Sequence, residues 1–269
     1  MDDRSFIITP DSFRRQLAAY HFFDVNLWMP DPSLQSFFDG SSLKSVLAKA
    51  GSYQIGRAIV ATARGYRQSP VAANQELTEA IADLPEAYGA AMLAPDASYE
   101  PGGFAAYLER LIARKVVLVR MFPRKLNFAL TDWCLGDQLA VLEQRRFPLM
   151  IWHTETDFDT LARLCERHPD LPVILEGNDK KLLYHNRSYV PLLKNYQNLY
   201  LETHNFIQYL GYEFFDQQQL GERLIFGTYL PANDPGAAVA PILAADIPES
   251  LKRRIASENL ENLIAGIRK

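Results

Sequence analysis

Short apolar runs of strand length recur along the chain at intervals of roughly 25 to 35 residues. Eight runs have this character, at residues 21–28, 57–63, 88–94, 116–123, 147–153, 171–177, 198–202 and 223–228. Val116–Val119 is apolar throughout, as expected of a strand covered on both faces. Between the runs, residues such as Phe158, Leu161, Ala162 and Cys165 recur at helical spacing. This alternation predicts parallel strands joined by crossover helices.

A closed barrel of eight strand-helix units accounts for this pattern. Such a barrel takes about 250 residues, and the chain has 269. A doubly wound open sheet is the alternative, but no Gly-x-Gly-x-x-Gly turn follows the first run. We therefore predict an α/β fold with one (β/α)8 TIM-barrel domain over residues 1–269, of which residues 1–19 form an N-terminal extension. A helical segment that starts at Pro248, with Leu251, Ile255 and Leu263 on one side, is expected to close the bottom or side of the barrel.

Composition narrows the class of partner. The chain carries 28 basic and 32 acidic residues, a net charge of -4, which gives no general attraction for nucleic acid or an anionic membrane. Cys134 and Cys165 are too few for a disulfide framework or a Cys-rich zinc site. No signal-type N-terminus and no apolar run of about 18 residues is present. We expect a cytoplasmic protein that binds a small molecule.

Polar and aromatic side chains stand at the ends of the predicted strands. In chain order they are Asn26, Trp28, Arg120, His153, Glu176, Glu202, His204 and Tyr229. Because the carboxyl ends of barrel strands surround the active sites of such folds, these side chains form the candidate site.

The order and spacing of these strand ends, from about Phe23 to Ile264, resemble the amidohydrolase superfamily in its decarboxylase and lactonase branch. Phe226–Pro231 keeps the frame Phe-Gly-Ser-Asp-x-Pro, and Asn198–Thr203 is similar to the family's acidic-Thr-Ser strand ending. The resemblance implies a TIM barrel whose mouth hydrolyses or decarboxylates a small molecule.

The resemblance also implies five metal ligands: His-x-His on the first strand, a His on each of the fifth and sixth, and an Asp after the eighth. Those places hold Asn26, Trp28, His153, Glu176 and Tyr229, so one of the five ligands is retained. A catalytic zinc normally needs three protein ligands, and an indole has no lone pair to offer. The usual metal centre is therefore predicted to be absent, and no cofactor is expected.

A displaced site for a divalent metal stays open as an alternative. His153, Glu155, Glu176, Glu202 and His204 all lie at the ends of neighbouring predicted strands. Side chains two residues apart on one strand point the same way, so His153 and Glu155 could face the mouth together if the strand extends that far.

Acid/base chemistry without a metal is the favoured hypothesis. His153 would act as the acid/base, with Glu176 or Glu202 as its partner, and Asn26 would donate to a developing oxyanion. Arg120 would clamp a substrate carboxylate. Trp28, His204 and Tyr229 would line the substrate-binding pocket.

Each of these residues also has a structural interpretation. A Glu that ends an apolar strand must be paired or hydrated, which a salt bridge with Arg120 or Lys180 would satisfy. Trp28 and Tyr229 could fill the space of a lost metal and close the mouth. The second functional hypothesis is therefore a non-catalytic barrel that binds a ligand or a partner. A homodimer is possible in either case.

Overall fold

The computed structural model describes residues 9–32, 34, 36–38, 40–177, 186–206 and 208–268, and within them the predicted barrel is confirmed. Eight parallel strands follow one another in sequence order around one sheet. Their bounds are β1 Phe22–Trp28, β2 Ile55–Ala61, β3 Ala87–Leu93, β4 Val116–Met121, β5 Leu149–Trp152, β6 Val173–Glu176, β7 Leu199–Glu202 and β8 Leu224–Ile225. Backbone hydrogen bonds from Val25 to Phe226 (3.0 Å) and from Trp28 to Leu230 (2.7 Å) close the sheet between β8 and β1.

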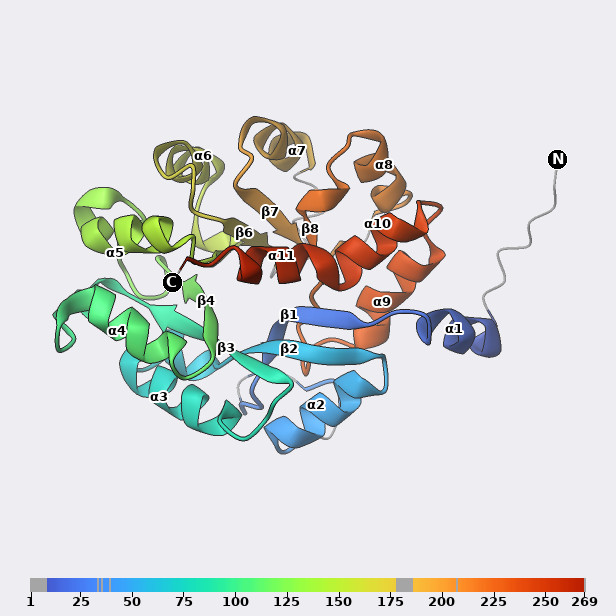
Figure 1. Ribbon diagram of the computed structural model, residues 1–269, viewed down its shortest axis with the longest axis horizontal. Helices are drawn as coiled ribbons and strands as arrows, with labels where there is room; N and C mark the ends of the chain where they lie inside the picture. The colour runs from blue at the N-terminus through green and yellow to red at the C-terminus, as the bar shows by residue number, and fades with distance from the viewer. Residues whose placement is uncertain are drawn as a thin grey trace.

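Helices surround the sheet and connect its strands (Figure 1). Their bounds are α1 Pro10–Leu17, α2 Leu43–Gly51, α3 Pro70–Ile81, α4 Gly103–Ile112, α5 Asp132–Arg145, α6 Phe158–Arg167, α7 Asn186–Asn195, α8 Gly211–Gln217, α9 Pro235–Ala244, α10 Glu249–Arg253 and α11 Asn259–Ala265. A π-helical turn, Arg254–Glu258, joins α10 to α11. None of the described helices is both long and apolar enough to cross a bilayer.

Local sequence signals set where several helices begin. The Asp157 side chain accepts from the Thr160 amide at the start of α6. Asp234 accepts from the Gly236 amide (2.8 Å) at the start of α9, as a turn or cap residue is expected to do. These caps satisfy amide groups that have no partner within the helix.

Two apolar cores lie on the two faces of the sheet. The outer core packs the strands against the helices, with residues such as Leu27, Val119 and Leu201. The inner core fills the barrel with strand residues that include Phe23, Val25, Ile59, Met92, Leu118, Met150, Ile174 and Ile225. The barrel interior is therefore packed with side chains and is not a pore.

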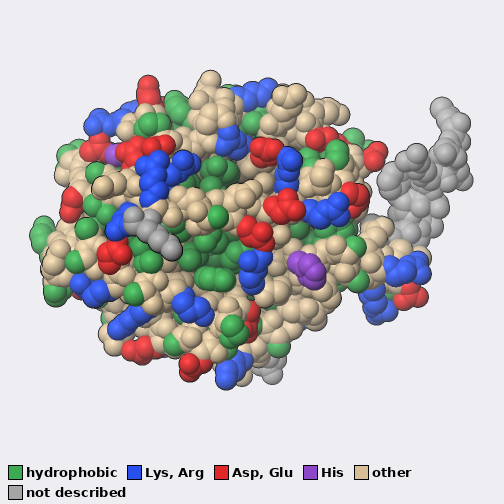
Figure 2. All heavy atoms as spheres, viewed as in Figure 1, with side chains coloured by type: hydrophobic (Ala, Val, Ile, Leu, Met, Phe, Trp, Pro, Cys, Tyr) green, Lys and Arg blue, Asp and Glu red, His purple; other side chains and the backbone are tan. Residues whose placement is uncertain are grey.

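The C-terminal helix closes the amino-terminal end of the barrel, as predicted. Figure 1 shows α11 lying across the strands at this end. Leu260 and Leu263 belong to the inner core, and Glu261 forms an ion pair with Arg57 near the start of β2. Asn259 donates to the carbonyl of Leu224 (2.9 Å) at the start of β8. Seen from this face, the centre of the molecule is hollowed and hydrophobic side chains gather there, with charged side chains around them (Figure 2).

One segment differs from its prediction. β5 ends at Trp152, so His153 and Glu155 lie in a 3-10 turn, His153–Glu155, instead of on one strand face. A further 3-10 turn, Pro95–Tyr99, lies between β3 and α4. Lys180, the alternative ion-pair partner for Glu176, lies outside the described residues.

Candidate functional site

The candidate site residues meet at the carboxyl end of the barrel, and most of them are buried there. Asn26, Trp28 and Glu176 are 0% exposed, Arg120 and Glu202 are 1% exposed, and His204 is 4% exposed. A water-sized space beside them would leave accessible surface on their atoms. These groups therefore form a filled polar centre and contact one another.

Asn26, Arg120 and Glu176 form one hydrogen-bonded triad. Arg120 Nη1 donates to Glu176 Oε2 (2.6 Å), and Arg120 Nη2 donates to Asn26 Oδ1 (2.8 Å). Asn26 Nδ2 donates to Glu176 Oε1 (2.8 Å). The salt bridge expected for Glu176 is thus formed with Arg120. The carboxylate that Arg120 clamps belongs to the protein, so its two terminal nitrogens are not free to hold a substrate.

Glu202 and His204 form the second buried pair. The Glu202 carboxylate bonds His204 Nδ1 through one oxygen and accepts from the His204 backbone amide (2.7 Å) through the other. The Cβ of any larger residue at Gly227 would lie 2.0 Å from Glu202 Oε1, so glycine lets the carboxylate approach the backbone. His204 Nε2 is buried and has no hydrogen-bond partner among the described residues.

Asp24 organises the end of β1, although the sequence did not single it out. Its carboxylate accepts from the amides of Asn26 (2.8 Å) and Thr228 (3.1 Å) and from the Thr228 hydroxyl. The register of β1 shifts between Asp24 and Leu27, and such a bulge turns successive residues to the same face. Val25 and Asn26 both face the barrel interior as a result. The sequence signal that could have identified Asp24 is its position as a charged residue within an apolar strand.

Aromatic rings cover this polar centre. Trp28 contacts Trp152 (5.9 Å between ring centroids), Tyr66 (6.1 Å) and Tyr229 (5.7 Å), and Phe122 packs on Trp152 (4.7 Å). The predicted packing of Trp28 against Tyr229 is therefore present. Only Tyr66 and Tyr229 of these five rings are partly exposed.

Tyr229 lies directly over His204. The two rings are stacked, with centroids 5.0 Å apart and planes 19° apart. Tyr229 has a φ of 60°, in the left-handed region that a bulky residue rarely adopts. Strained backbone of this kind often marks functional sites.

His153 stands at the edge of this centre. It is partly buried, and its Nδ1 lies 3.4 Å from the carbonyl oxygen of Glu176. Glu155 turns away, because its carboxylate accepts from the backbone amides of Arg124 (2.9 Å) and Lys125 (3.0 Å). Glu155 is therefore separate from the Glu202 and His204 pair.

Lys125 is an exposed cation at the rim that the sequence did not indicate. Its Nζ lies 5.2 Å from the centre of the Tyr66 ring and 5.5 Å from that of Trp152. Since Arg120 is buried under Trp28, with its guanidinium 4.8 Å from the centre of that ring, Lys125 is the better placed of the two to meet a carboxylate from solvent.

Burial and charge change the acidity of these groups. Burial raises the pKa of Glu176, against the opposing effects of Arg120 and Asn26. Burial lowers the pKa of His204, but the nearby Glu202, Glu176 and Asp24 carboxylates raise it by more, so its pKa lies above the ordinary value. Burial also raises the pKa of Tyr229. Arg120 and a protonated His204 thus place two cations beside Glu176 and Glu202.

The five positions of the family's metal set do not fit a metal here. Asn26 Oδ1, the one ligand atom of that amide, already accepts from Trp28 Nε1 (2.8 Å) and Arg120. Burial raises the pKa of Tyr229, which opposes the loss of a proton that ligation by its phenol would need. A different group, Glu176, Glu202 and His204, has one potential ligand atom each within 4.8 Å of one another. The Arg120 guanidinium beside Glu176 opposes a further cation in that group.

Comparison with known proteins gives the fold alone. No family model and no curated protein matches the chain. A 5-carboxyvanillate decarboxylase of Sphingomonas paucimobilis is 14% identical, covers 91% of this chain and 99% of its own, and gives a TM-score of 0.67. A probable 2-pyrone-4,6-dicarboxylic acid hydrolase of Acinetobacter baumannii is 13% identical with the same coverage and a TM-score of 0.66. An uncharacterized TIM-barrel protein of Bordetella bronchiseptica is 17% identical, again with the same coverage, and gives a TM-score of 0.70. The TIM-barrel fold that the resemblance implied is thereby confirmed.

Proposed function

We propose that this amidohydrolase-like barrel is an enzyme that hydrolyses or decarboxylates a small carboxylated molecule through acid/base chemistry at His204, without the metal centre that the family resemblance implies. The observation that carries the proposal is a group of buried nitrogen atoms around the aromatic cover. His204 Nε2, Arg120 Nε and Trp152 Nε1 have no hydrogen-bond partner among the described residues. Buried polar atoms without partners are costly, and a small molecule rich in oxygen would satisfy them once a movement of the aromatic cover opened the filled centre.

His204 is the best supported acid/base group. Glu202 holds its Nδ1, which leaves Nε2 to exchange a proton with the substrate or with an attacking water, as in other His-carboxylate pairs. In hydrolysis, Nε2 would take the proton of water as its oxygen attacks the substrate carbon, and would return that proton to the leaving oxygen. Because the pKa of His204 is raised, the neutral base forms only above the ordinary range of an imidazole. Hydrolysis should therefore speed up as the pH rises through that pKa.

Access to His204 requires Tyr229 to move. Tyr229 is the partly exposed ring that stacks on His204, and it follows a short strand at the seam of the barrel. Displacement of its ring would uncover the face of the imidazole on which it stacks, and the hydrogen bonds that join Asn26, Arg120 and Glu176 do not involve Tyr229. Lys125 at the rim would then attract the carboxylate of the substrate, the role first expected of Arg120.

Turnover of carboxylated probes tests the proposal. The substrates in the names of the similar structures, 5-carboxyvanillate and 2-pyrone-4,6-dicarboxylate, are the first two to incubate with the purified protein. His204→Gln should abolish conversion. His168→Gln should retain it, because His168 is also bonded to carboxylates, those of Asp132 and Glu143, but lies in a different cluster. Equal turnover in wild type and His204→Gln would exclude the proposed base. His153→Asn, run in parallel, tests the original assignment of His153.

A non-catalytic barrel is the second candidate, and one observation favours it. Asn26, Arg120 and Glu176 satisfy one another under a continuous aromatic cover. If the barrel only binds its ligand, calorimetry should give saturable binding of a probe while chromatography recovers that probe unchanged. Product formation that depends on His204 would exclude this candidate.

A further inference from the structure

A cavity of about 420 Å³ lies at the amino-terminal end of the barrel, opposite the candidate site. Its walls come from residues that precede β5, β6 and β8, from Tyr200 of β7, and from the C-terminal helix. Catalytic residues are not expected at this end of a barrel, which usually contributes to stability alone. A space of this size is large enough for a small organic molecule.

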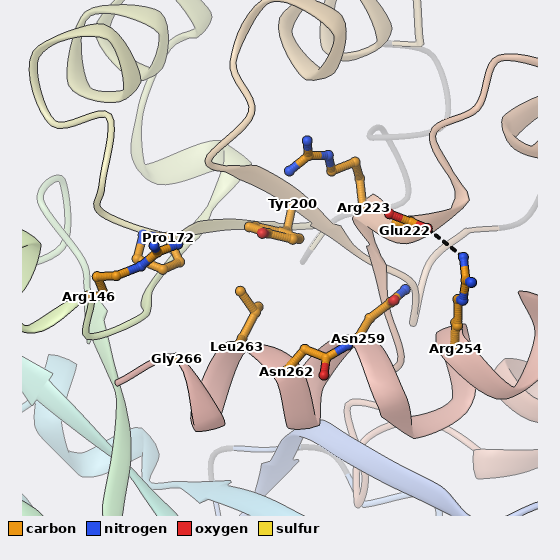
Figure 3. A pocket seen from close by; sticks show the side chains of 10 residues that line it. All are labelled: Arg146, Pro172, Tyr200, Glu222, Arg223, Arg254, Asn259, Asn262, Leu263 and Gly266. Atoms are coloured by element: carbon orange, nitrogen blue, oxygen red, sulfur yellow. Dashed lines mark hydrogen bonds and ion pairs between the residues drawn. The ribbon is translucent and has the colours of Figure 1, made fainter. Parts of the chain in front are cut away.

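The lining of this cavity is strongly basic, although the chain as a whole has a net charge of -4. It contains Arg146, Arg223 and Arg254 but a single acidic residue, Glu222. Glu222 is ion-paired with Arg254, as Figure 3 shows. The charges of Arg146 and Arg223 are left without a carboxylate in the lining.

The two remaining arginines are held in different ways. Arg223 donates to the backbone and side-chain oxygens of Gln197, which are neutral groups, and its guanidinium lies 5.4 Å from the centre of the Tyr200 ring. This fixes the guanidinium but leaves its charge uncompensated. Arg146 ends α5 in a left-handed conformation, and the described residues offer its side chain neither an ion pair nor a hydrogen bond.

An apolar floor accompanies these charges. In Figure 3 the Tyr200 ring and the Leu263 side chain face one another across the cavity, and Arg146 lies beside Pro172 at one end. Leu263 is fixed because it also belongs to the inner core of the barrel. The cavity thus combines a flat apolar centre with basic walls.

We propose that this cavity is a binding site for a small anion with a compact apolar body, and that it favours a doubly charged head group such as a phosphate monoester. Two uncompensated guanidiniums match two negative charges, and arginine binds phosphate and carboxylate oxygens through paired hydrogen bonds. Tyr200, Pro172 and Leu263 would contact the apolar body. This site is independent of the chemistry proposed for His204.

Calorimetry with phenyl phosphate, benzoate and neutral phenol tests the site. Phenyl phosphate should bind one per chain, benzoate more weakly and phenol not measurably. Arg146→Gln/Arg223→Gln should weaken phenyl phosphate by about tenfold or more. Arg15→Gln/Arg163→Gln removes the same charge from exposed positions elsewhere and should leave binding unchanged.

A second variant that blocks the cavity tests the site independently, in case the double arginine variant does not fold. Asn262 is exposed on α11 and lines the cavity, so Asn262→Phe should fill the space and abolish binding with both arginines in place. His204→Gln should bind phenyl phosphate as wild type does, which separates this cavity from the barrel mouth. Binding of benzoate as tight as that of phenyl phosphate would assign the site to carboxylates. Absence of saturable binding by the wild type, or binding that survives both cavity variants, would overturn the proposal.

Discussion

Arg120 and Glu176 form an ion pair of 2.6 Å in which both side chains are at most 1% exposed. Asn26 bonds both partners, so the pair is fixed from a third strand. The pair thus places a buried positive charge on a side chain at the mouth of the barrel.

The two partners of this pair should be energetically coupled. Arg120→Met leaves the Glu176 carboxylate buried and unpaired, and should lower the free energy of unfolding by about 3–5 kcal/mol. Arg120→Met/Glu176→Gln should cost less than the sum of the single changes, with a coupling energy of about 1–3 kcal/mol. Urea denaturation of the four proteins measures this cycle. Additive effects would mean that the two side chains do not stabilise one another.

Asp24 should make stability depend on pH. Burial raises its pKa from 3.8 to about 6, so the folded state holds a proton that the unfolded state has lost between about pH 4 and 6. The cost of ionising Asp24 is absent below this window and complete above it. Relative to Asp24→Asn, the wild type should lose roughly 2 kcal/mol of unfolding free energy as the pH rises from 4 to 6.5.

Urea denaturation at several pH values checks this expectation for Asp24. Asp11→Asn is the matched control, because Asp11 is exposed on α1. A constant difference between wild type and Asp24→Asn across the window would contradict the assignment.

Because the backbone at Tyr229 is strained, a glycine at this position should stabilise the protein more than an alanine, the reverse of their usual order. Both Tyr229→Gly and Tyr229→Ala remove the ring that covers His204, but only glycine adopts a φ of 60° without steric cost. Tyr229→Gly should therefore be more stable than Tyr229→Ala by about 1 kcal/mol. Thermal denaturation compares the two.

Both variants should also let diethyl pyrocarbonate modify His204 faster than in the wild type, as judged by peptide mass analysis. Equal protection of His204 in all three proteins would show that another residue covers it.

Metal analysis separates the proposed chemistry from a rebuilt metal site. We expect substoichiometric zinc, manganese and iron in the purified protein, and probe turnover that is insensitive to chelator, because Arg120 opposes a cation beside Glu176. Stoichiometric metal that disappears in Glu202→Gln and His204→Gln but persists in His153→Asn would instead assign it to Glu176, Glu202 and His204. Loss of metal with His153 would support the retained family ligand.

The fold was predictable because its signal repeats. Each strand is an apolar run and each helix has one apolar face, so errors at single boundaries do not change the architecture. β5 and β8 were predicted too long, since apolar character continues beyond the last ladder hydrogen bond: Phe226 pairs with Val25 across the seam and not with β7. The resemblance to the amidohydrolase superfamily supported the prediction of eight strand-helix units.

The site was predictable as a set of residues but not as a set of contacts. Strand ends identified Asn26, Arg120, Glu176, Glu202 and His204, and the structure brings all five together. The pairing of these side chains depends on the curvature of the barrel and on the bulge in β1. Neither feature can be recognised from the periodicity of the sequence. Arg120 consequently read as a substrate clamp, and the role of Asp24 in shaping the bulge was missed.

The C-terminal helix also bears on how the molecule assembles. The seam between β1 and β8 and the contact of Leu260 with the inner core both join segments from opposite ends of the sequence. Contacts of such long separation form late, because a large loop must close before they contribute. During synthesis the early strands therefore expose an unpaired edge and an uncovered apolar interior until α11 has been made.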